Sequence, residues 1–211
     1  MLLSHPTKLQ EEVKEKDEDI QKVLKRLEDE SKKYSLNSIG PIKGKIITEI
    51  IDKYKPKRIL EVGALYGYSA ILMADLLPED VGKVVTIEIN NSNADTAIKN
   101  IEEAGLSRKI EVIVGNALEV IPSLYAQLPF DLLFLDGRKN QYLKYLLLVE
   151  EKNLVRNDGG IVVADNVGAY EKDMSDYLAY VRKRYRSETI GTTLEFTNNV
   201  YDAIELSTKV A

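Results

Sequence analysis

Two apolar stretches in the second half of the sequence end in acidic and amide side chains. Leu133-Phe134-Leu135 is followed by Asp136, and Val162-Val163-Ala164 is followed by Asp165 and Asn166. Such stretches predict buried strands, so these polar side chains should stand where strands end, roughly 5 Å apart if the two strands are neighbours. Two carboxylates and an amide oxygen form a hard oxygen site of the kind that Mg²⁺ prefers. The alternative is that Asp165 and Asn166 only cap the helix that follows.

Two further charged residues could act beside such a metal. Lys139 lies shortly after Asp136, and a nearby divalent cation disfavours the ammonium form of a lysine, which would make Lys139 a general base. Without the metal it is an ordinary solvated lysine. Glu195 lies in a β-rich stretch that we predict to be the penultimate strand. Facing the site it could hold a second substrate hydroxyl, whereas on an exposed face it has no role.

A glycine-containing turn follows the first predicted strand, in Glu61-Val62-Gly63-Ala64-Leu65-Tyr66-Gly67-Tyr68-Ser69. Glycines there let the backbone approach a ligand closely, at the edge where open α/β sheets bind ligands. The spacing G-x-x-x-G differs from the G-x-G-x-x-G of dinucleotide-binding enzymes, and it suits a methionine-bearing nucleoside without phosphates. Glu88 ends the second predicted strand, where a carboxylate can accept both ribose hydroxyls. The alternative is a tight turn and an ordinary surface glutamate.

The order of the predicted elements would bring these side chains to one edge of a sheet. The predicted strands are 58–62, 83–89, 110–114, 130–135 and 160–164, and the helices between and after them are 68–77, 92–104, 118–124, 142–154 and 172–184. Apolar strands that are each followed by a helix indicate a parallel sheet covered on both faces. Two helices, 9–33 and 40–54, precede the sheet.

The end of the sequence breaks this alternation. Two β-rich stretches, 190–196 and 200–206, are joined by Thr197-Asn198-Asn199. A turn that short favours a hairpin, so the last strand should run antiparallel to its neighbours. We therefore predict an α/β fold with a doubly wound, seven-stranded, mostly parallel sheet.

The composition limits the classes of protein to consider. The 211 residues are 44% hydrophobic and 30% charged, which predicts one domain over 1–211, with residues 1–40 as a helical cap within it. The lack of cysteine excludes disulfides, thiolate metal sites and a cysteine nucleophile. No stretch is apolar and long enough for a membrane span and none is typical of a secretion signal, so we expect a cytoplasmic protein. His5, the only histidine, is expected to be neither ligand nor catalyst.

The charge balance bears on nucleic-acid binding. The formal net charge is −5 at pH 7, which argues against a broad basic face for nucleic acid. Arg182, Lys183, Arg184 and Arg186 could form a local basic patch. A solvated helix face is the preferred interpretation of this cluster.

The chain resembles the catechol O-methyltransferases and the related caffeoyl-CoA O-methyltransferases from about residue 34 to residue 206. The segments that carry the resemblance are Lys43-Gly44-Lys45-Ile46, Leu60-Glu61-Val62-Gly63-Ala64, Gly67-Tyr68-Ser69-Ala70, Ile87-Glu88-Ile89-Asn90, Phe134-Leu135-Asp136, Ala164-Asp165-Asn166-Val167 and Leu194-Glu195-Phe196. They occur in the family's order and at its spacing. The resemblance implies an enzyme that transfers a methyl group from S-adenosylmethionine to an oxygen of an aromatic, catechol-like small molecule.

The resemblance also implies roles for individual residues. Asp136, Asp165 and Asn166 match the family's Mg²⁺ ligands, Lys139 its general base, and Glu195 and Asn166 the residues that orient the acceptor. Ile39, Glu61, Gly63, Ser69, Glu88 and Asp136 match positions around S-adenosylmethionine. Ala117 falls where the animal enzymes have a serine near the adenine, so a side-chain hydrogen bond is lost there. These roles agree with a mechanism in which the metal lowers the pKa of a bound hydroxyl, Lys139 takes the proton, and the oxyanion attacks the methyl group.

The sequence departs from the animal catechol enzymes around the acceptor. Gly137 and Arg138 replace a histidine and a tryptophan, and Ser35 replaces an aromatic gatekeeper. Gly168-Ala169-Tyr170 lacks a proline that walls the catechol, a loss for which Tyr170 could partly compensate. We therefore expect a broader acceptor site, with Arg138 favouring acidic acceptors by pairing with a carboxylate. The alternative is that Arg138 points to solvent or pairs with a neighbouring glutamate.

Other functions remain open at this point. An enzyme of the same family could methylate a hydroxyuridine in tRNA, although the acidic balance disfavours nucleic acid. A protein that binds S-adenosylmethionine without catalysis would have no need of Lys139 and the metal ligands. A nucleotide-dependent dehydrogenase is disfavoured by the glycine spacing. We expect no membrane partner, and a homodimer is left open.

Overall fold

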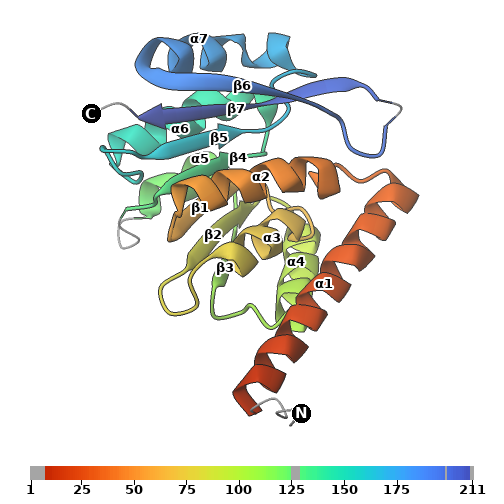
Figure 1. Cartoon of the computed structure of the whole chain (residues 1–211). Coiled ribbons are helices and arrows are strands. Elements are labelled where there is room, and N and C mark those ends of the chain that lie inside the picture. Colours follow the sequence, from red (N-terminus) through yellow and green to blue (C-terminus); the bar gives the residue numbers. More distant parts are fainter. Residues whose placement is uncertain (1–7, 125–128, 198, 210–211) are drawn as a thin grey trace, which may run out of the picture.

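The computed structural model describes residues 8–124, 129–197 and 199–209. His5 lies outside the described residues, and so does Asn198 of the predicted turn. Seven strands form one sheet in the order β3-β2-β1-β4-β5-β7-β6 (Figure 1). The strands are β1 (Arg58–Val62), β2 (Lys83–Glu88), β3 (Ile110–Val114), β4 (Leu132–Leu135), β5 (Ile161–Ala164), β6 (Tyr185–Thr193) and β7 (Tyr201–Lys209). Strand β7 runs antiparallel to both neighbours, and β1 to β5 pair in parallel. The predicted seven-stranded sheet with an antiparallel last strand is confirmed.

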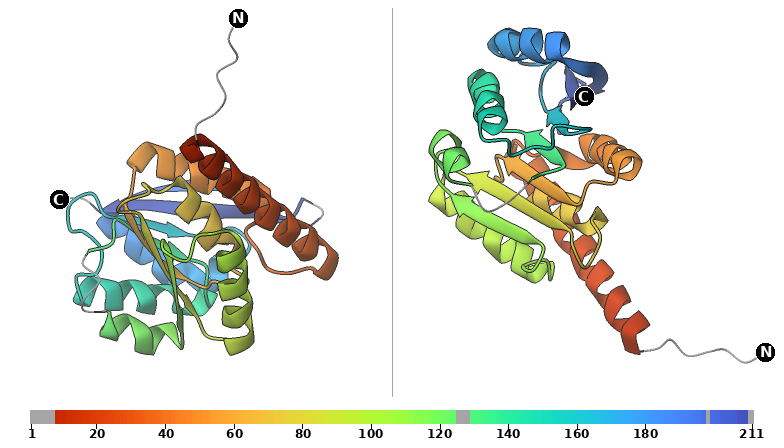
Figure 2. Two further views of the ribbon diagram at one scale, coloured as in Figure 1. Left: turned by 90° about the horizontal axis from the view of Figure 1, so that it is seen from below. Right: turned by 90° about the vertical axis from the view of Figure 1, so that its left-hand side faces the viewer.

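Helices cover both faces of this sheet (Figure 2). One face carries α1 (Lys8–Tyr34), α2 (Gly40–Tyr54), α3 (Tyr68–Leu76) and α4 (Asn91–Glu103), and the other carries α5 (Ala117–Val120), α6 (Tyr142–Glu151) and α7 (Ser175–Arg184). Because side chains alternate along a strand, Phe134 of β4 packs with the first set while Leu133 and Leu135 pack with the second. The central strands are thus apolar on both faces, as buried parallel strands are.

Helix α1 is fixed to the body by its apolar stripe and by one arginine. Ile20, Val23, Leu24 and Leu27 are buried. Arg26 donates to Asn100 Oδ1 (3.0 Å) and Glu103 Oε2 (2.8 Å) of α4. Asn100 in turn donates to the carbonyl of Tyr66 in the turn after β1 (2.8 Å). The long N-terminal helix therefore supports the glycine-containing turn.

Several predicted boundaries were wrong, mainly at the last strands. Strand β6 begins at Tyr185, directly after α7, and ends at Thr193, whereas the prediction was 190–196. Strand β6 pairs only with β7, and an edge strand needs no continuous apolar stretch. Glu195 therefore lies in the β6–β7 connection and not within a strand.

Smaller differences occur around the fourth strand and the last helices. Helix α5 gives way to a 3₁₀ turn, Ile121–Ser123, which contains a proline. A second 3₁₀ turn, Lys139–Gln141, precedes α6, and a third, Glu171–Met174, precedes α7. Phe130 forms only an isolated bridge with Val155, ahead of β4. Within the described ranges, no helix combines the length and the apolar character that crossing a membrane requires.

Candidate active site

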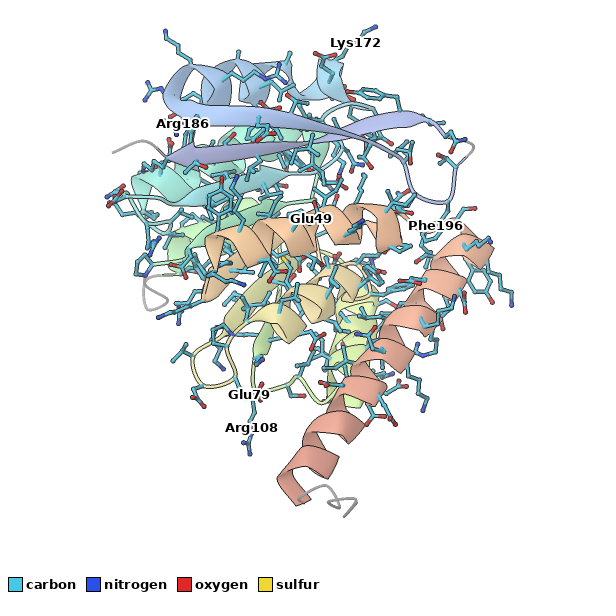
Figure 3. All side chains as sticks on the ribbon, viewed as in Figure 1. Glu49, Glu79, Arg108, Lys172, Arg186 and Phe196 are labelled. Carbon is cyan, nitrogen blue, oxygen red and sulfur yellow. The ribbon has the colours of Figure 1, made fainter. Side chains whose placement is uncertain are left out.

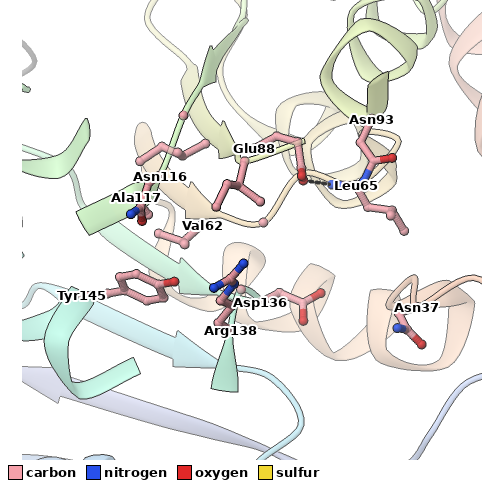
Figure 4. Close-up of a pocket in the computed structure, with 15 residues that line it drawn as sticks. Asn37, Val62, Leu65, Glu88, Asn93, Asn116, Ala117, Asp136, Arg138 and Tyr145 are labelled. Carbon is pink, nitrogen blue, oxygen red and sulfur yellow. Dashed lines mark hydrogen bonds between the residues drawn. The ribbon is translucent and has the colours of Figure 1, made fainter. Parts of the chain in front are cut away.

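A cavity of about 220 Å³ opens beside the glycine-containing turn, at the carboxyl ends of β1, β2 and β4 (Figure 4). We call it the glycine-loop cavity. Its wall is formed by Asn37, Val62, Gly63, Leu65, Ile87, Glu88, Ile89, Asn93, Gly115, Asn116, Ala117, Asp136, Gly137, Arg138 and Tyr145. At Gly63 the backbone φ is +105°, and an added Cβ would stand 2.5 Å from the carbonyl oxygen of Asp136. Only glycine lets the loops after β1 and β4 approach this closely.

Glu88 ends β2 and organises two loops around this cavity. Its side chain is 6% exposed. Oε2 accepts from the amide of Leu65 (2.8 Å) and Oε1 from the amide of Asn90 (2.9 Å). A carboxylate offers about four acceptor positions, so both oxygens can still accept hydroxyl groups from a ligand in the cavity.

Glu61 lies deeper than the sequence suggested. It is fully buried, accepts a hydrogen bond from the Ser69 hydroxyl, and does not line the glycine-loop cavity. Burial raises the pKa of Glu61 to about 7. Ser69 and Ile39 instead line a small neighbouring cavity of about 20 Å³, together with Gly63 and Asp136. Glu61 therefore stands behind Ser69.

A second cavity of about 220 Å³ lies on the other side of Asp136. We call it the carboxylate cavity. Its wall is formed by Leu36, Asn37, Ser38, Lys43, Asp136, Gly137, Lys139, Asp165, Asn166, Tyr170, Leu194, Glu195 and Thr197. Asn37, Asp136 and Gly137 line both cavities. A ligand in one is thus in reach of a ligand in the other.

The pairing of β4 with β5 places the predicted metal ligands side by side. Leu135 is in register with Ala164, so Asp136 and Asp165 each follow a paired residue. Asp165 is 2% exposed. Burial and the neighbouring charge of Asp136 raise the pKa of Asp165 to about 7, against the opposing effect of two lysines. Two carboxylates forced together in this way gain from a cation placed between them.

Lys139 lies beside Asp136 at the wall of the carboxylate cavity. It begins the 3₁₀ turn after β4, and its Nζ donates to Asp136 Oδ1 (2.8 Å) and to the Tyr142 hydroxyl (3.1 Å). Its side chain is 20% exposed. The ammonium is therefore held at the wall of the carboxylate cavity and not released into solvent.

Lys43 and Asp202 belong to the same site, although the sequence analysis gave neither a role. Lys43 Nζ lies 2.7 Å from Asp165 Oδ1 and 2.6 Å from Asp202 Oδ2. Lys43 is 2% exposed and Asp202 is fully buried. Burial opposes the ammonium, but Asp165 and Asp202 outweigh it and raise the pKa of Lys43. A signal was present, because Lys43 shares the buried stripe of α2 with Ile47 and Ile50.

Glu195 closes the carboxylate cavity from the β6–β7 connection. Its Oε1 accepts from the amides of Ile42 (2.5 Å) and Lys43 (3.0 Å), at the beginning of α2. A Cβ at Gly40 would stand 2.7 Å from Glu195 Cδ. Burial raises the pKa of Glu195. Figure 3 shows Phe196 in this connection, near the α1–α2 end of the molecule. Glu195 caps α2, and its Oε2 remains for a ligand.

Comparison with known proteins identifies the family. A family model described as O-methyltransferase matches residues 11–190. The chain belongs to the O-methyltransferase family. It is similar to catechol O-methyltransferase of Mus musculus (39% identity over 154 residues, 72% of this chain and 56% of the relative) and of Sus scrofa (37% over 175 residues, 79% and 90%). The chain thus spans little more than half of the mouse relative.

Solved structures of this family share the fold. The O-methyltransferase TomG from Streptomyces achromogenes, in complex with SAM, has 28% identity and a TM-score of 0.77 over 90% of both chains. A putative O-methyltransferase from Klebsiella pneumoniae has 27% identity and a TM-score of 0.76, also over 90% of both chains. The sheet and its flanking helices are therefore those of the O-methyltransferases.

The donor set of the carboxylate cavity fits a hard divalent cation. Among the described residues, no group of three or more histidine, cysteine, aspartate or glutamate side chains forms a metal site. The set here is smaller, with Asp136, Asp165 and the amide of Asn166. Asn166 Nδ2 is engaged with Asp202 Oδ2 (2.9 Å), which leaves the carbonyl oxygen for the cavity. Three oxygens suit Mg²⁺, which keeps open positions for water and substrate.

The remaining predicted residues divide between the two cavities. Ala117 lines the glycine-loop cavity, and Tyr170 lines the carboxylate cavity. Arg138 lines the glycine-loop cavity, beside Tyr145 (Figure 4), and not the carboxylate cavity. The hypothesis that Arg138 selects acidic acceptors therefore loses its geometric basis. Ser35 is exposed and lines neither cavity.

Proposed function

We propose that this family member transfers a methyl group from S-adenosylmethionine to a hydroxyl oxygen of a catechol-like small molecule, with Mg²⁺ bound beside the acceptor. The observation that carries the proposal is the pair of cavities that meet at Asp136. One is built for a nucleoside without phosphates, and the other holds oxygen ligands next to a lysine. We further propose that residues 1–211 form a single methyltransferase domain.

The glycine-loop cavity supplies the contacts that a nucleoside needs. Glu88 presents two carboxylate oxygens to the ribose, and Val62, Leu65 and Ile87 give apolar walls for the base. Ser69 and Ile39 line the adjoining small cavity, where the methionine part would lie. S-adenosylmethionine would supply the methyl group as a sulfonium. The chain's contribution is to hold that methyl group at the boundary between the cavities, because positioning two reactants removes much of the barrier.

The carboxylate cavity supplies the groups that activate the acceptor. Asp136, Asp165 and Asn166 would hold the Mg²⁺ ion, which when bound lowers the pKa of a coordinated hydroxyl. In its neutral amine form, which a neighbouring divalent cation favours, Lys139 Nζ takes the proton of the reacting hydroxyl and becomes an ammonium beside Asp136. Glu195 Oε2 accepts a hydrogen bond from the second hydroxyl. A catechol provides adjacent oxygens for these two partners.

Methylation of a tRNA base is the second candidate. One member of the basic cluster of α7 and β6 lies away from the cavities, because Arg186 pairs with Thr208, whose partner in β5 is Ile161, the first residue of that strand. Arg186 thus lies at the amino ends of the strands, opposite the site. Arg182 is also engaged with Glu205 (2.7 Å). The small-molecule acceptor is favoured on both grounds.

An acceptor panel tests the proposal. The protein would be incubated with S-adenosylmethionine and Mg²⁺ and with catechols, single phenols or bulk tRNA, and each product would be identified by its mass. We expect methylated catechols, little methylation of single phenols, and no product when a chelator removes the metal. Methylated tRNA without methylated catechols, or full activity with excess chelator, would contradict the proposal.

A further inference from the structure

The loop that follows β5 is fastened to β7 by three hydrogen bonds. The amide of Val167 donates to the carbonyl of Ala203 (2.9 Å), the amide of Ala169 donates to Asp202 Oδ1 (2.8 Å), and Asn166 Nδ2 donates to Asp202 Oδ2 (2.9 Å). Two of these three bonds end on the Asp202 side chain. The position of this short loop therefore depends on one fully buried carboxylate.

The fit of this loop against β7 leaves no spare room. A Cβ at Gly168 would stand 2.6 Å from the carbonyl carbon of Asp202 and 2.7 Å from the amide nitrogen of Ala203. These contacts are with backbone atoms of β7, which cannot move aside for a side chain at position 168 as the end of a flexible side chain could. Asn166 itself has a left-handed backbone, with φ of +65°. Such a conformation persists where the surroundings hold it in place.

Asp202 also decides which end of the Asn166 amide faces the carboxylate cavity. A carboxylate accepts hydrogen bonds and cannot donate one, so only the NH₂ end of the amide can face Asp202. The carbonyl oxygen, which is the end that can bind a cation, is thereby turned away from Asp202. Replacing the carboxylate by a group that can also donate would remove this selection.

Lys43 balances the charge that this arrangement requires. Asp165 and Asp202 are both buried, and Lys43 lies between them at 2.7 and 2.6 Å. A buried carboxylate without a partner is costly. The positive charge of Lys43 thus stabilises both carboxylates in their ionised form. Asp202 can then accept the hydrogen bonds of the loop, and Asp165 can line the cavity as a carboxylate. Lys43 comes from α2, so three elements meet at this cluster.

We propose that Asp202, supported by Lys43, is a positioning residue that presents the Asn166 carbonyl oxygen and the Asp165 carboxylate to the divalent cation. The inference rests on the proposed function, because it requires a metal in the carboxylate cavity. Asp202 lines neither cavity, so it would act through the loop that bears the metal ligands. Partners of this kind, one step removed from a metal, typically change its affinity by about 10- to 100-fold.

Binding of Mn²⁺ by the whole protein provides the test, without any need for turnover. Free Mn²⁺ would be followed by electron paramagnetic resonance during titration of the wild type, Asp202→Asn and Asp202→Ala. Glu205→Gln is the matched control, because Glu205 is a buried acid of the same strand whose partner is Arg182. Calorimetry with S-adenosylmethionine and thermal unfolding would be measured for each variant.

The expected order of Mn²⁺ affinity is wild type, then Asp202→Asn, then Asp202→Ala, with a total loss of about 10- to 100-fold. Asparagine at this position has one acceptor oxygen, which can serve either Asn166 or the amide of Ala169 but not both, and its NH₂ group can also face the Asn166 carbonyl. S-adenosylmethionine affinity should stay within twofold (roughly 0.4 kcal/mol). Glu205→Gln should lower thermal stability without changing Mn²⁺ affinity. If Asp202→Ala does not fold, the near-isosteric Asp202→Asn decides.

Two results would overturn the inference in different ways. Wild-type Mn²⁺ binding with unchanged affinity in both Asp202 variants would leave the proposed function intact and remove the role of Asp202. A wild type that binds S-adenosylmethionine but no Mn²⁺ would instead overturn the metal site and the inference with it. Gly168→Ala gives an independent check without a change of charge. It should push the loop from β7 and weaken Mn²⁺ binding, and unchanged affinity would count against the inference.

Discussion

The two cavities on either side of Asp136 are equal in size but are built by opposite means. The glycine-loop cavity is bordered mostly by backbone and apolar side chains, with Glu88 as its one buried acid. The carboxylate cavity holds Asp136, Asp165, Glu195, Lys43 and Lys139. The glycine-loop cavity can bind an uncharged group, such as a nucleoside, mainly through packing contacts. The carboxylate cavity places three carboxylates beside two lysines, so a bound cation would reduce the repulsion between the carboxylates.

The cavities also differ in how far apart their parts lie in the sequence. The ends of β1 and β2 and the segments after them supply seven of the fifteen residues of the glycine-loop wall, as two neighbouring strand–turn–helix units, and the rest come from Asn37, from the segments after β3 and β4, and from Tyr145. The carboxylate cavity draws on α2, on the ends of β4 and β5, and on the β6–β7 connection. Long-range packing must therefore be correct before the second site exists. Substitutions in it should separate binding of the methyl donor from turnover.

Removal of one of the two carboxylates proposed to hold the metal should give the largest effect. Asp165→Ala should abolish turnover, because loss of one hard ligand leaves the cation poorly held. Asp136→Ala should abolish it too and should also weaken S-adenosylmethionine binding, because Asp136 lines both cavities. Product mass gives turnover and calorimetry gives affinity. Equal loss of S-adenosylmethionine affinity in both variants would contradict the separation of the cavities.

Loss of the base should be the next largest effect and should be confined to the carboxylate cavity. Lys139→Ala should lower kcat by ~10²-fold or more and leave S-adenosylmethionine affinity nearly unchanged. Lys144→Ala, at an exposed position of α6, is the matched control and should behave as wild type. If the Lys139→Ala variant matched the wild-type rate at every pH, Lys139 would have no part in the chemistry.

In the glycine-loop cavity, Glu88→Ala should affect only the binding of S-adenosylmethionine. Loss of the Glu88 carboxylate should weaken this binding by about 1.5–3 kcal/mol, the contribution of hydrogen bonds to a charged group. Calorimetry measures this effect, with Glu102→Ala at an exposed position of α4 as the control. Turnover at saturating S-adenosylmethionine should change little. Unchanged affinity would place the ribose elsewhere.

The difference between the cavities explains which parts could be predicted from the sequence. The parallel strands and their helices follow from apolar stretches and turn residues, which are local features. The acids at the ends of β4 and β5 were predicted because a buried strand that ends in a carboxylate is itself a local pattern. Their placement side by side follows from the sheet order, with Leu135 opposite Ala164.

Lys43 and Asp202 were missed because their meaning depends on contacts across the fold. A lysine within a helix is usually solvated, and only its place on the stripe of Ile47 and Ile50 hinted at burial. Asp202 lies in a strand buried on both faces, where a charge requires a partner. That partner lies on α2, far away in the sequence. The start of β6 was missed since an edge strand with polar residues has no continuous apolar stretch.

The smallest expected effect is that of Arg138→Ala. This variant tests whether Arg138 contacts the methyl donor or the acceptor. From the sequence, Arg138 was expected to favour acidic acceptors, but its side chain lines the glycine-loop cavity beside Tyr145 (Figure 4). Stacked on the adenine ring of S-adenosylmethionine, this guanidinium would contribute about 0.5–1 kcal/mol, so Arg138→Ala should weaken S-adenosylmethionine binding by roughly two- to fivefold. The ratio of kcat/KM for a catechol acid to that for its neutral amide should be the same in wild type and variant. Lys144→Ala again serves as the control for loss of a surface cation. A preference for the acid that disappears in Arg138→Ala would instead show that Arg138 reaches the acceptor, and that the boundary between the cavities lies on the other side of this residue.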